Sequence, residues 1–243
     1  MSGIIEQLRQ RRQTDPGMFP ESPAGKWAQT AQAADAAEAA LDGVVMFYGD
    51  KPIRTGRRDI DWSGSHRKHQ EWRAQLNRFM MLYPLCAGYR NTKDEKYARA
   101  ARDYIEDWLD AHQPYPTQPD MPRPAPGDST LNMAVRLGST RHPGWLMALV
   151  DLDDSGAFDE AFVERVVSSM VWQLDWLAMN LPAGANWRIA ALDCLFSQAF
   201  RLPERFGKHL SGAVDGLNTE FATQILPDGA HLERSAGYND WMC

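Results

Sequence analysis

Apolar residues recur at spacings of three and four along most of this 243-residue chain, and this periodicity limits it to a helical fold. The clearest stripes run over 72–87, 97–109 and 158–181. Residues that stop a helix follow them, such as the polar turn at 91–94 and Pro182. The pattern predicts helices joined by short connections, which pair as helical hairpins.

The remaining segments extend this prediction with two exceptions. Further helices are expected over 27–41, 131–137, 145–152, 189–200 and 206–226. The apolar run 44–48 lies between glycines and predicts one short strand or extended segment. The proline-rich segment 113–127 predicts a long loop, because proline lacks an N–H donor and disfavours helical backbone before it.

The chain divides into a lead-in and one helical domain. Residues 1–23 hold three prolines and are expected to be flexible, with a short helix possible over 3–12. Residues 24–243 form the domain. Helical hairpins without a short sequence repeat are typical of a bundle, a solenoid or an α/α toroid. The expected fold class is therefore all-α, with at most short strands.

Charge and composition exclude several classes of protein. The net charge is −6, whereas a general nucleic-acid binder usually carries a basic patch, so no nucleic acid is expected as partner. No apolar run is long enough to cross a membrane. The first 13 residues lack the apolar core of a secretory signal, so the chain as written is expected in the cytoplasm, or in the periplasm or outside the cell if a leader is missing.

The three cysteines are scattered through the sequence. Cys86 and Cys194 fall in apolar helical patterns and are expected to be buried. No spacing resembles a set of metal ligands, so neither a metal nor another cofactor is expected.

Polar side chains gather near the C-terminal end, in the segment 225–241. A Pro-Asp-Gly turn signal at 227–229 precedes them. His231, Glu233 and Ser235 alternate after this turn, so in extended backbone they share one face. A histidine, a carboxylate and a hydroxyl on one face indicate a proton-transfer site, although a surface hairpin has the same local pattern.

A second polar cluster lies where the segment 182–193 passes from loop to helix. Asn186 suits a helix N-cap, because its side-chain oxygen can accept a backbone N–H that the first turn leaves unpaired. An amide beside Trp187 and Arg188 also suits an acidic sugar, since a helix N-terminus favours negative charge. Both interpretations stay open.

Nine tryptophans are many for this length, and exposed indoles offer flat apolar faces to sugar rings. Those in helical stripes, Trp108, Trp172 and Trp176, are expected in the core. The candidates for a groove are Trp62, Trp145, Trp187 and Trp241. Arg136 and Arg141 flank a helix break, where the plain interpretation is exposed charge, favoured more for Arg141.

Several motifs follow one another in order from about Trp27 to the last residue. They are Trp72-Arg73-Ala74-Gln75-Leu76-Asn77-Arg78-Phe79, the segment 89–97, Arg136-Leu137 with Trp145, Gly184-Ala185-Asn186-Trp187, and the segment 228–238, DGAHLERSAGY. Together they resemble the N-terminal helical domain of the heparinase II/III family of polysaccharide lyases.

The resemblance implies an incomplete α/α toroid whose cleft binds an acidic polysaccharide and cleaves it by β-elimination. It makes Asn186 the amide that neutralises the uronate carboxylate and Tyr238 the catalytic tyrosine, with His231 as a further catalytic candidate. The substrate-binding candidates are Trp187, Arg188, Arg136, Glu233, Arg234 and Trp145. The chemistry is consistent, because preorganised donors stabilise the charge that builds on the carboxylate, and a tyrosine can protonate the leaving oxygen.

Two features depart from the family pattern. Trp187 stands where many members have histidine, so the base is Tyr238 itself, His231 or a residue outside this chain, or the protein is not a lyase of the usual kind. Members generally continue into more helices and a β-sandwich domain, whereas this sequence ends at Cys243. The toroid is therefore expected to be truncated, its cleft completed by the missing domain, and this piece alone weakly active or inactive.

Two other functions stay open at this point. A glycoside hydrolase on a similar helical fold needs two opposed carboxylates, for which Glu233 with Asp193 or Asp240 is a candidate pair. A non-catalytic sugar-binding domain needs no such pair of carboxylates. Heparan-type, alginate and other uronate polymers all offer the same acidic C5 proton, so the sequence leaves the polymer open.

Overall fold

The computed structural model describes residues 3–19, 31–47, 51–112, 129–140, 142 and 144–226. Helices dominate these ranges, and the only strands within them are β1 (Val44–Val45) and β2 (Ile53–Arg54), which pair antiparallel. The helical elements are α1 (Ile4–Thr14), η1 (Pro16–Met18), α3 (Ala31–Leu41), α4 (Gln70–Asn77), α5 (Leu82–Thr92), α6 (Glu95–Ala111), α7 (Thr130–Leu137), α8 (Gly144–Asp151), α9 (Glu160–Met179), α10 (Ala185–Arg201), α11 (Pro203–Phe206), η2 (Gly207–His209) and α12 (Leu210–Gln224). The all-α prediction is confirmed.

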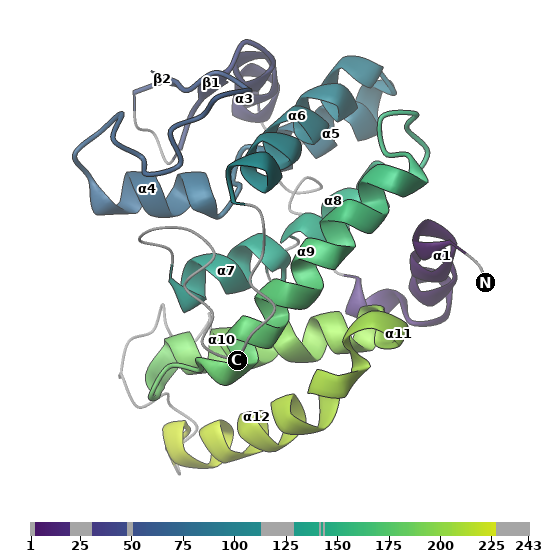
Figure 1. Ribbon diagram of the computed structural model, residues 1–243, viewed down its shortest axis with the longest axis vertical. Coiled ribbons are helices and arrows are strands. Elements are labelled where there is room, and N and C mark those ends of the chain that lie inside the picture. The colour runs from purple at the N-terminus through teal and green to yellow at the C-terminus, as the bar shows by residue number, and fades with distance from the viewer. Residues whose placement is uncertain are drawn as a thin grey trace.

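From α3 onward the helices follow one another across the molecule in chain order, whereas α1 lies beside the later helices (Figure 1). α3 to α6 lie at one end with the two short strands, α7 to α9 occupy the middle, and α10 and α12 lie side by side at the other end. The predicted hairpin of α5 and α6 is present. Its turn is closed by Lys93 in left-handed backbone, and the Asp94 carboxylate caps α6 by accepting from the backbone N–H of Lys96 at 2.9 Å.

The N-terminal segment is part of this body. α1 packs against α8, α9 and α10, with Ile4 and Leu8 buried. The Arg9 Nε donates to the Asp153 carboxylate at 2.5 Å and adds a polar contact to the loop after α8. The expectation of a flexible lead-in is therefore corrected for residues 3–19, because the two apolar residues one helical turn apart find partners on helices distant in sequence.

An aromatic cluster around one arginine forms the centre of the core. Trp108 and Trp145 meet edge to face at 5.2 Å between ring centroids, and Phe79 packs on Trp145 at 5.1 Å. The Arg136 guanidinium lies 4.5 Å from the Trp108 ring centroid. Its nitrogens donate to the Gln173 side chain at 3.0 Å and to the Asn77 carbonyl at 2.9 Å. A buried cation is thus stabilised by an aromatic face and neutral oxygens.

This cluster corrects three of the predictions. Trp145 and Arg136, both expected to bind substrate, have no exposed surface, and Trp62 is also buried. The reason for Trp145 lies in α8, all eight residues of which are buried, so this helix has no outward face. The predicted core positions of Trp108, Trp172 and Trp176 are confirmed.

Both cysteines expected in the core are there. Cys86 and Cys194 are buried and free. Burial raises the pKa of both thiols, because a thiolate loses its hydration in the core.

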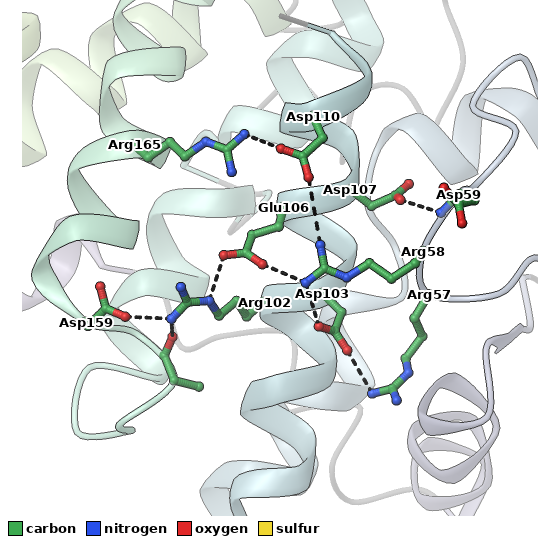
Figure 2. A network of polar contacts seen from close by, with 11 residues as sticks. Arg57, Arg58, Asp59, Arg102, Asp103, Glu106, Asp107, Asp110, Asp159 and Arg165 are labelled. Atoms are coloured by element: carbon green, nitrogen blue, oxygen red, sulfur yellow. Dashed lines mark hydrogen bonds and ion pairs between the residues drawn. The ribbon is translucent and has the colours of Figure 1, made fainter.

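A network of carboxylates on α6 holds the segment that follows β2 (Figure 2). Asp107 accepts three hydrogen bonds, from the backbone N–H of Asp59 at 2.6 Å and of Ile60 at 3.1 Å, and from the Trp62 indole at 2.9 Å. On the outer side of the helix, Arg58 bridges Asp103 and Glu106, and Arg102 bridges Glu106 and Asp159. The contacts of Asp107, Asp103 and Glu106 hold the irregular segment on α6, and Arg102 joins α6 to the start of α9.

Loss of the Asp107 carboxylate is expected to destabilise the fold. In Asp107→Ala, two backbone N–H groups and one indole N–H lose their acceptor, and the site is buried. We expect the free energy of unfolding to fall by about 2–4 kcal/mol, measured by urea denaturation. Asp110→Ala is the matched control, because its ion pairs are exposed and should contribute less than about 1 kcal/mol. Equal losses in the two variants would contradict this role.

Candidate functional site

The site begins at a kink that fixes α7 against α10. The chain turns between α7 and α8 through Gly138 at φ 106° and Gly144 at φ 55°. A Cβ on Gly144 would lie 2.3 Å from the Gly138 nitrogen, so only glycine allows this approach. From α10, the Gln198 side-chain amide donates to the carbonyls of Leu137 at 3.0 Å and Gly138 at 2.7 Å. The packing of α10 on α7 is therefore tied to one backbone conformation.

Arg201 completes this anchor from the last turn of α10. It is buried and donates to the carbonyls of Met18 at 2.7 Å and Ser139 at 2.9 Å. Burial lowers its pKa to about 10, so the guanidinium stays charged at neutral pH. With its C-terminal half held in this way, α10 presents its N-terminus at a fixed place beside α7.

Asn186 lies in the first turn of α10, after the N-cap residue Gly184. The interpretation of Asn186 as the N-cap is therefore corrected. Its side chain is buried to 8% exposure, and the described part of the chain gives its amide no hydrogen-bond partner. An amide at the positive end of a 17-residue helix is suited to bind a carboxylate.

Trp187, the next residue, has the opposite environment. It is 45% exposed, whereas Trp62 and Trp145 are buried. Its indole lines a hollow of about 340 Å³ between α4, α7 and the start of α10. The other lining residues are His69, Gln70, Glu71, Arg73, Ala74, Arg78, Ser129 and Asn132. Trp187 thus lines a hollow, and its contact with a substrate stays a prediction.

Two arginines of α4 and its C-cap give the hollow a positive character. Arg78 is held in place, with its Nε donating to the Asn132 side chain at 2.9 Å and its Nη1 to Glu71 at 2.9 Å. Arg73 makes no ion pair or hydrogen bond through its guanidinium within the described residues. No local sequence pattern predicts that these arginines meet Trp187, because α4 and α10 are more than 100 residues apart.

Arg188 faces away from this hollow and has partners of its own. Its Nε lies 2.7 Å from a carboxylate oxygen of Glu220 on α12, and its Nη1 donates to the Pro182 carbonyl at 2.8 Å. The structure therefore gives Arg188 a role in joining the first turn of α10 to α12. Contact with a substrate would require these bonds to be exchanged.

Most of the remaining predicted site residues are not described by the structure. His231, Glu233, Ser235, Arg234, Tyr238, Asp240 and Trp241 lie outside the described residues, and so does Arg141. Asp193 is described, and its carboxylate accepts from the Thr140 backbone and hydroxyl and from the Ser197 hydroxyl. These bonds give Asp193 a role in holding the loop after α7.

Two further properties bear on the class of site. Within the ranges given above, no helix combines the length and apolar character needed to cross a bilayer. The same residues contain no group of three or more histidine, cysteine, aspartate or glutamate side chains arranged to hold a metal ion.

Helical hairpins in series, with the fold of the solved structures described below, form the N-terminal portion of an α/α toroid. The family model of the heparinase II/III N-terminus matches residues 2–242, and the chain belongs to this family. No curated protein matches the chain in sequence.

Solved structures agree with this assignment at the level of the fold. The heparan sulfate lyase HepC from Pedobacter heparinus is 23% identical with a TM-score of 0.71, over 92% of this chain and 35% of that one. A mutant of the same lyase gives 23% identity and a TM-score of 0.72, over 95% and 36%. A heparinase III with methylated lysines is 18% identical with a TM-score of 0.69, over 86% and 34%. The chain thus spans about a third of the length of these relatives.

Proposed function

We propose that this chain is the substrate-positioning helical part of a polysaccharide lyase that cleaves a uronate-containing polymer by β-elimination. The observation that carries the proposal is Asn186, a nearly buried amide without a protein partner among the described residues, set at the N-terminus of α10. Family membership and the likeness to structures named as heparan sulfate lyases support it.

Asn186 acts on the acidity of the substrate. A uronate carboxylate accepts a hydrogen bond from the amide, and the positive end of α10 favours the negative charge. When a base removes the proton at C5, charge builds on this carboxylate, and a donor already in place stabilises it without reorganisation. The electron pair of the C5–H bond then forms a C4–C5 double bond, and the C4–O bond breaks.

The proton transfers are assigned to residues near the C-terminal end of the chain. Tyr238 protonates the departing oxygen, and the base is either Tyr238 in its ionised form or His231. Trp187, in the position of the usual histidine, is not the base, because an indole nitrogen donates its proton and has no free lone pair.

A glycoside hydrolase is the less favoured function. It would need two carboxylates facing one another across a cleft, and Asp193 is engaged by Thr140 and Ser197. A non-catalytic sugar-binding domain would use the same hollow but leave every polymer intact.

The products distinguish these three functions. The full chain as it occurs in the cell is incubated with heparan-type, alginate and other uronate polymers, and ultraviolet absorbance and reducing ends are followed together. Elimination raises the absorbance, because the new double bond is conjugated with the carboxylate. It also raises the number of reducing ends, because the C4–O bond of the polymer breaks. Reducing ends without absorbance would show hydrolysis, and binding without either signal would show a non-catalytic relative.

A further inference from the structure

The hollow beside Trp187 has a second hollow as its neighbour. This second one measures about 250 Å³ and shares Glu71 and Arg78 with the first. Met80, Leu131 and Val135 give it an apolar wall. The ion pair of Arg78 with Glu71, at 2.9 Å, therefore stands between two adjoining spaces, each lined by both α4 and α7 residues.

We propose that the hollow between α4, α7 and α10 is a subsite for an acidic sugar unit, in which the ring stacks on Trp187 and an anionic substituent binds Arg73. This inference rests on the proposed function, because it places the sugar next to the unit whose carboxylate Asn186 holds. The substituent is a carboxylate or a sulfate, which present the same negatively charged oxygens to a guanidinium.

Among the described residues that line this hollow, Arg73 is the arginine whose guanidinium has no ion pair or hydrogen bond, so we take it as the group that binds the anion. Arg78 is bonded to Glu71 and Asn132, whereas Arg73 has no such partner in the described structure. Among the lining arginine and carboxylate side chains, two arginines and one glutamate give a net charge of +1. One anionic substituent would therefore neutralise the hollow.

The Arg73 side chain is also held in position at its base. Gly64 lies against it at φ 70°, and a Cβ at that glycine would come within 2.8 Å of the Arg73 Cβ. Packing of the stem restricts the rotamers of a long side chain before any ligand arrives. The guanidinium is thus offered to the hollow at a smaller loss of entropy than an arginine with a free stem.

Trp187 and Asn186 serve neighbouring sugar units. They are adjacent in the chain, so their Cα atoms are about 3.8 Å apart, yet on a helix their side chains diverge by about 100°. Asn186 points to a buried environment and Trp187 to the hollow. A polymer that places one carboxylate at Asn186 would bring the next ring against the indole.

The test is a set of binding measurements on the full chain, by calorimetry, with Arg73→Gln as the main variant. Glutamine keeps the packed methylene groups of the stem and removes the charge, and Arg73→Lys restores the charge without the planar fork. Arg99→Gln is the matched control, because Arg99 is an exposed α6 arginine without a partner in the described ranges and lines a different hollow. Circular dichroism checks that each variant is folded.

We expect Arg73→Gln to weaken the binding of acidic oligosaccharides about tenfold, with partial recovery in Arg73→Lys and less than a twofold change in Arg99→Gln. Trp187→Ala should weaken binding to a similar degree, and Trp187→Phe less, because a smaller ring still stacks. An affinity in Arg73→Gln or Trp187→Ala equal to that of the unmodified chain would overturn the subsite.

The choice of oligosaccharide identifies the substituent. An alginate oligosaccharide carries carboxylates alone, whereas a heparan-type one carries sulfates as well. The chemically desulfated form of the heparan-type ligand has the same sugar chain without the sulfates and allows a direct comparison. Loss of affinity for all three assigns a carboxylate to Arg73, and loss for the sulfated ligand alone assigns a sulfate. If unsaturated product forms but Arg73→Gln binds normally, the subsite fails and the lyase stands. If binding depends on Arg73 but no product forms, the subsite stands and the lyase proposal fails.

Discussion

Replacing Trp145 with alanine is expected to lower the free energy of unfolding by about 3–5 kcal/mol, because a fully buried indole leaves a large cavity. The indole packs on Phe79 and Trp108, and its ring centroid lies 5.9 Å from the Arg136 guanidinium. Truncation would therefore also remove one of the aromatic rings that contact the buried Arg136 guanidinium. Urea denaturation of the chain measures the loss.

Trp187→Ala is the matched comparison for this prediction. Its indole is 45% exposed, so the free energy of unfolding should change by less than about 0.5 kcal/mol while sugar binding falls. The two tryptophans thus separate stability from binding. A Trp145→Ala protein that unfolds like the unmodified chain but binds oligosaccharide more weakly would return Trp145 to the groove and contradict the core assignment.

Asn186→Ala is expected to lower kcat about 10²–10³-fold, the range found when one preorganised donor to a developing oxyanion is removed. The fold should tolerate the change, because the described structure shows no hydrogen bond lost with this amide, and alanine favours a helix by up to about 0.7 kcal/mol more. Initial rates of product formation, measured beside unfolding curves, give both quantities.

Asn218→Ala is the control for this substitution, since Asn218 is an exposed amide on α12. It should leave kcat unchanged. Asn186→Asp sharpens the test, because a second carboxylate at the helix start repels the uronate and should lower turnover at least as far as alanine does. Turnover in Asn186→Ala close to that of Asn218→Ala would remove the amide from the mechanism.

Local sequence patterns predict much of the fold. The stripe 97–109 and the polar turn before it were enough to predict α6 and its pairing with α5, because periodicity and capping act within a few residues. The same local rules misjudged α1, where the prolines after it suggested a loose segment. Burial of Ile4 and Leu8 depends on α8, α9 and α10, and local sequence does not encode those contacts.

The site divides in the same way. The sequence predicts that Asn186 and Trp187 lie where a loop enters a helix, and the structure places both in the first turn of α10, while their roles toward a substrate stay predictions. Residue type alone makes Trp62 and Trp145 candidates for a groove, whereas the helices that cover them decide their exposure, and both are buried. The sequence does not predict that Arg73 and Arg78 lie near Trp187, because this contact joins residues more than 100 positions apart.

The most direct measurement of the central claim is the ultraviolet progress curve of the full chain on a uronate polymer, with Tyr238→Phe beside it. The lyase account predicts rising absorbance for the unmodified protein, no rise for Tyr238→Phe, and equal affinity of both for the oligosaccharide. In the proposed mechanism the phenol is required, because it would protonate the leaving oxygen. An unchanged progress curve in Tyr238→Phe, or chain cleavage without any absorbance, would contradict the account.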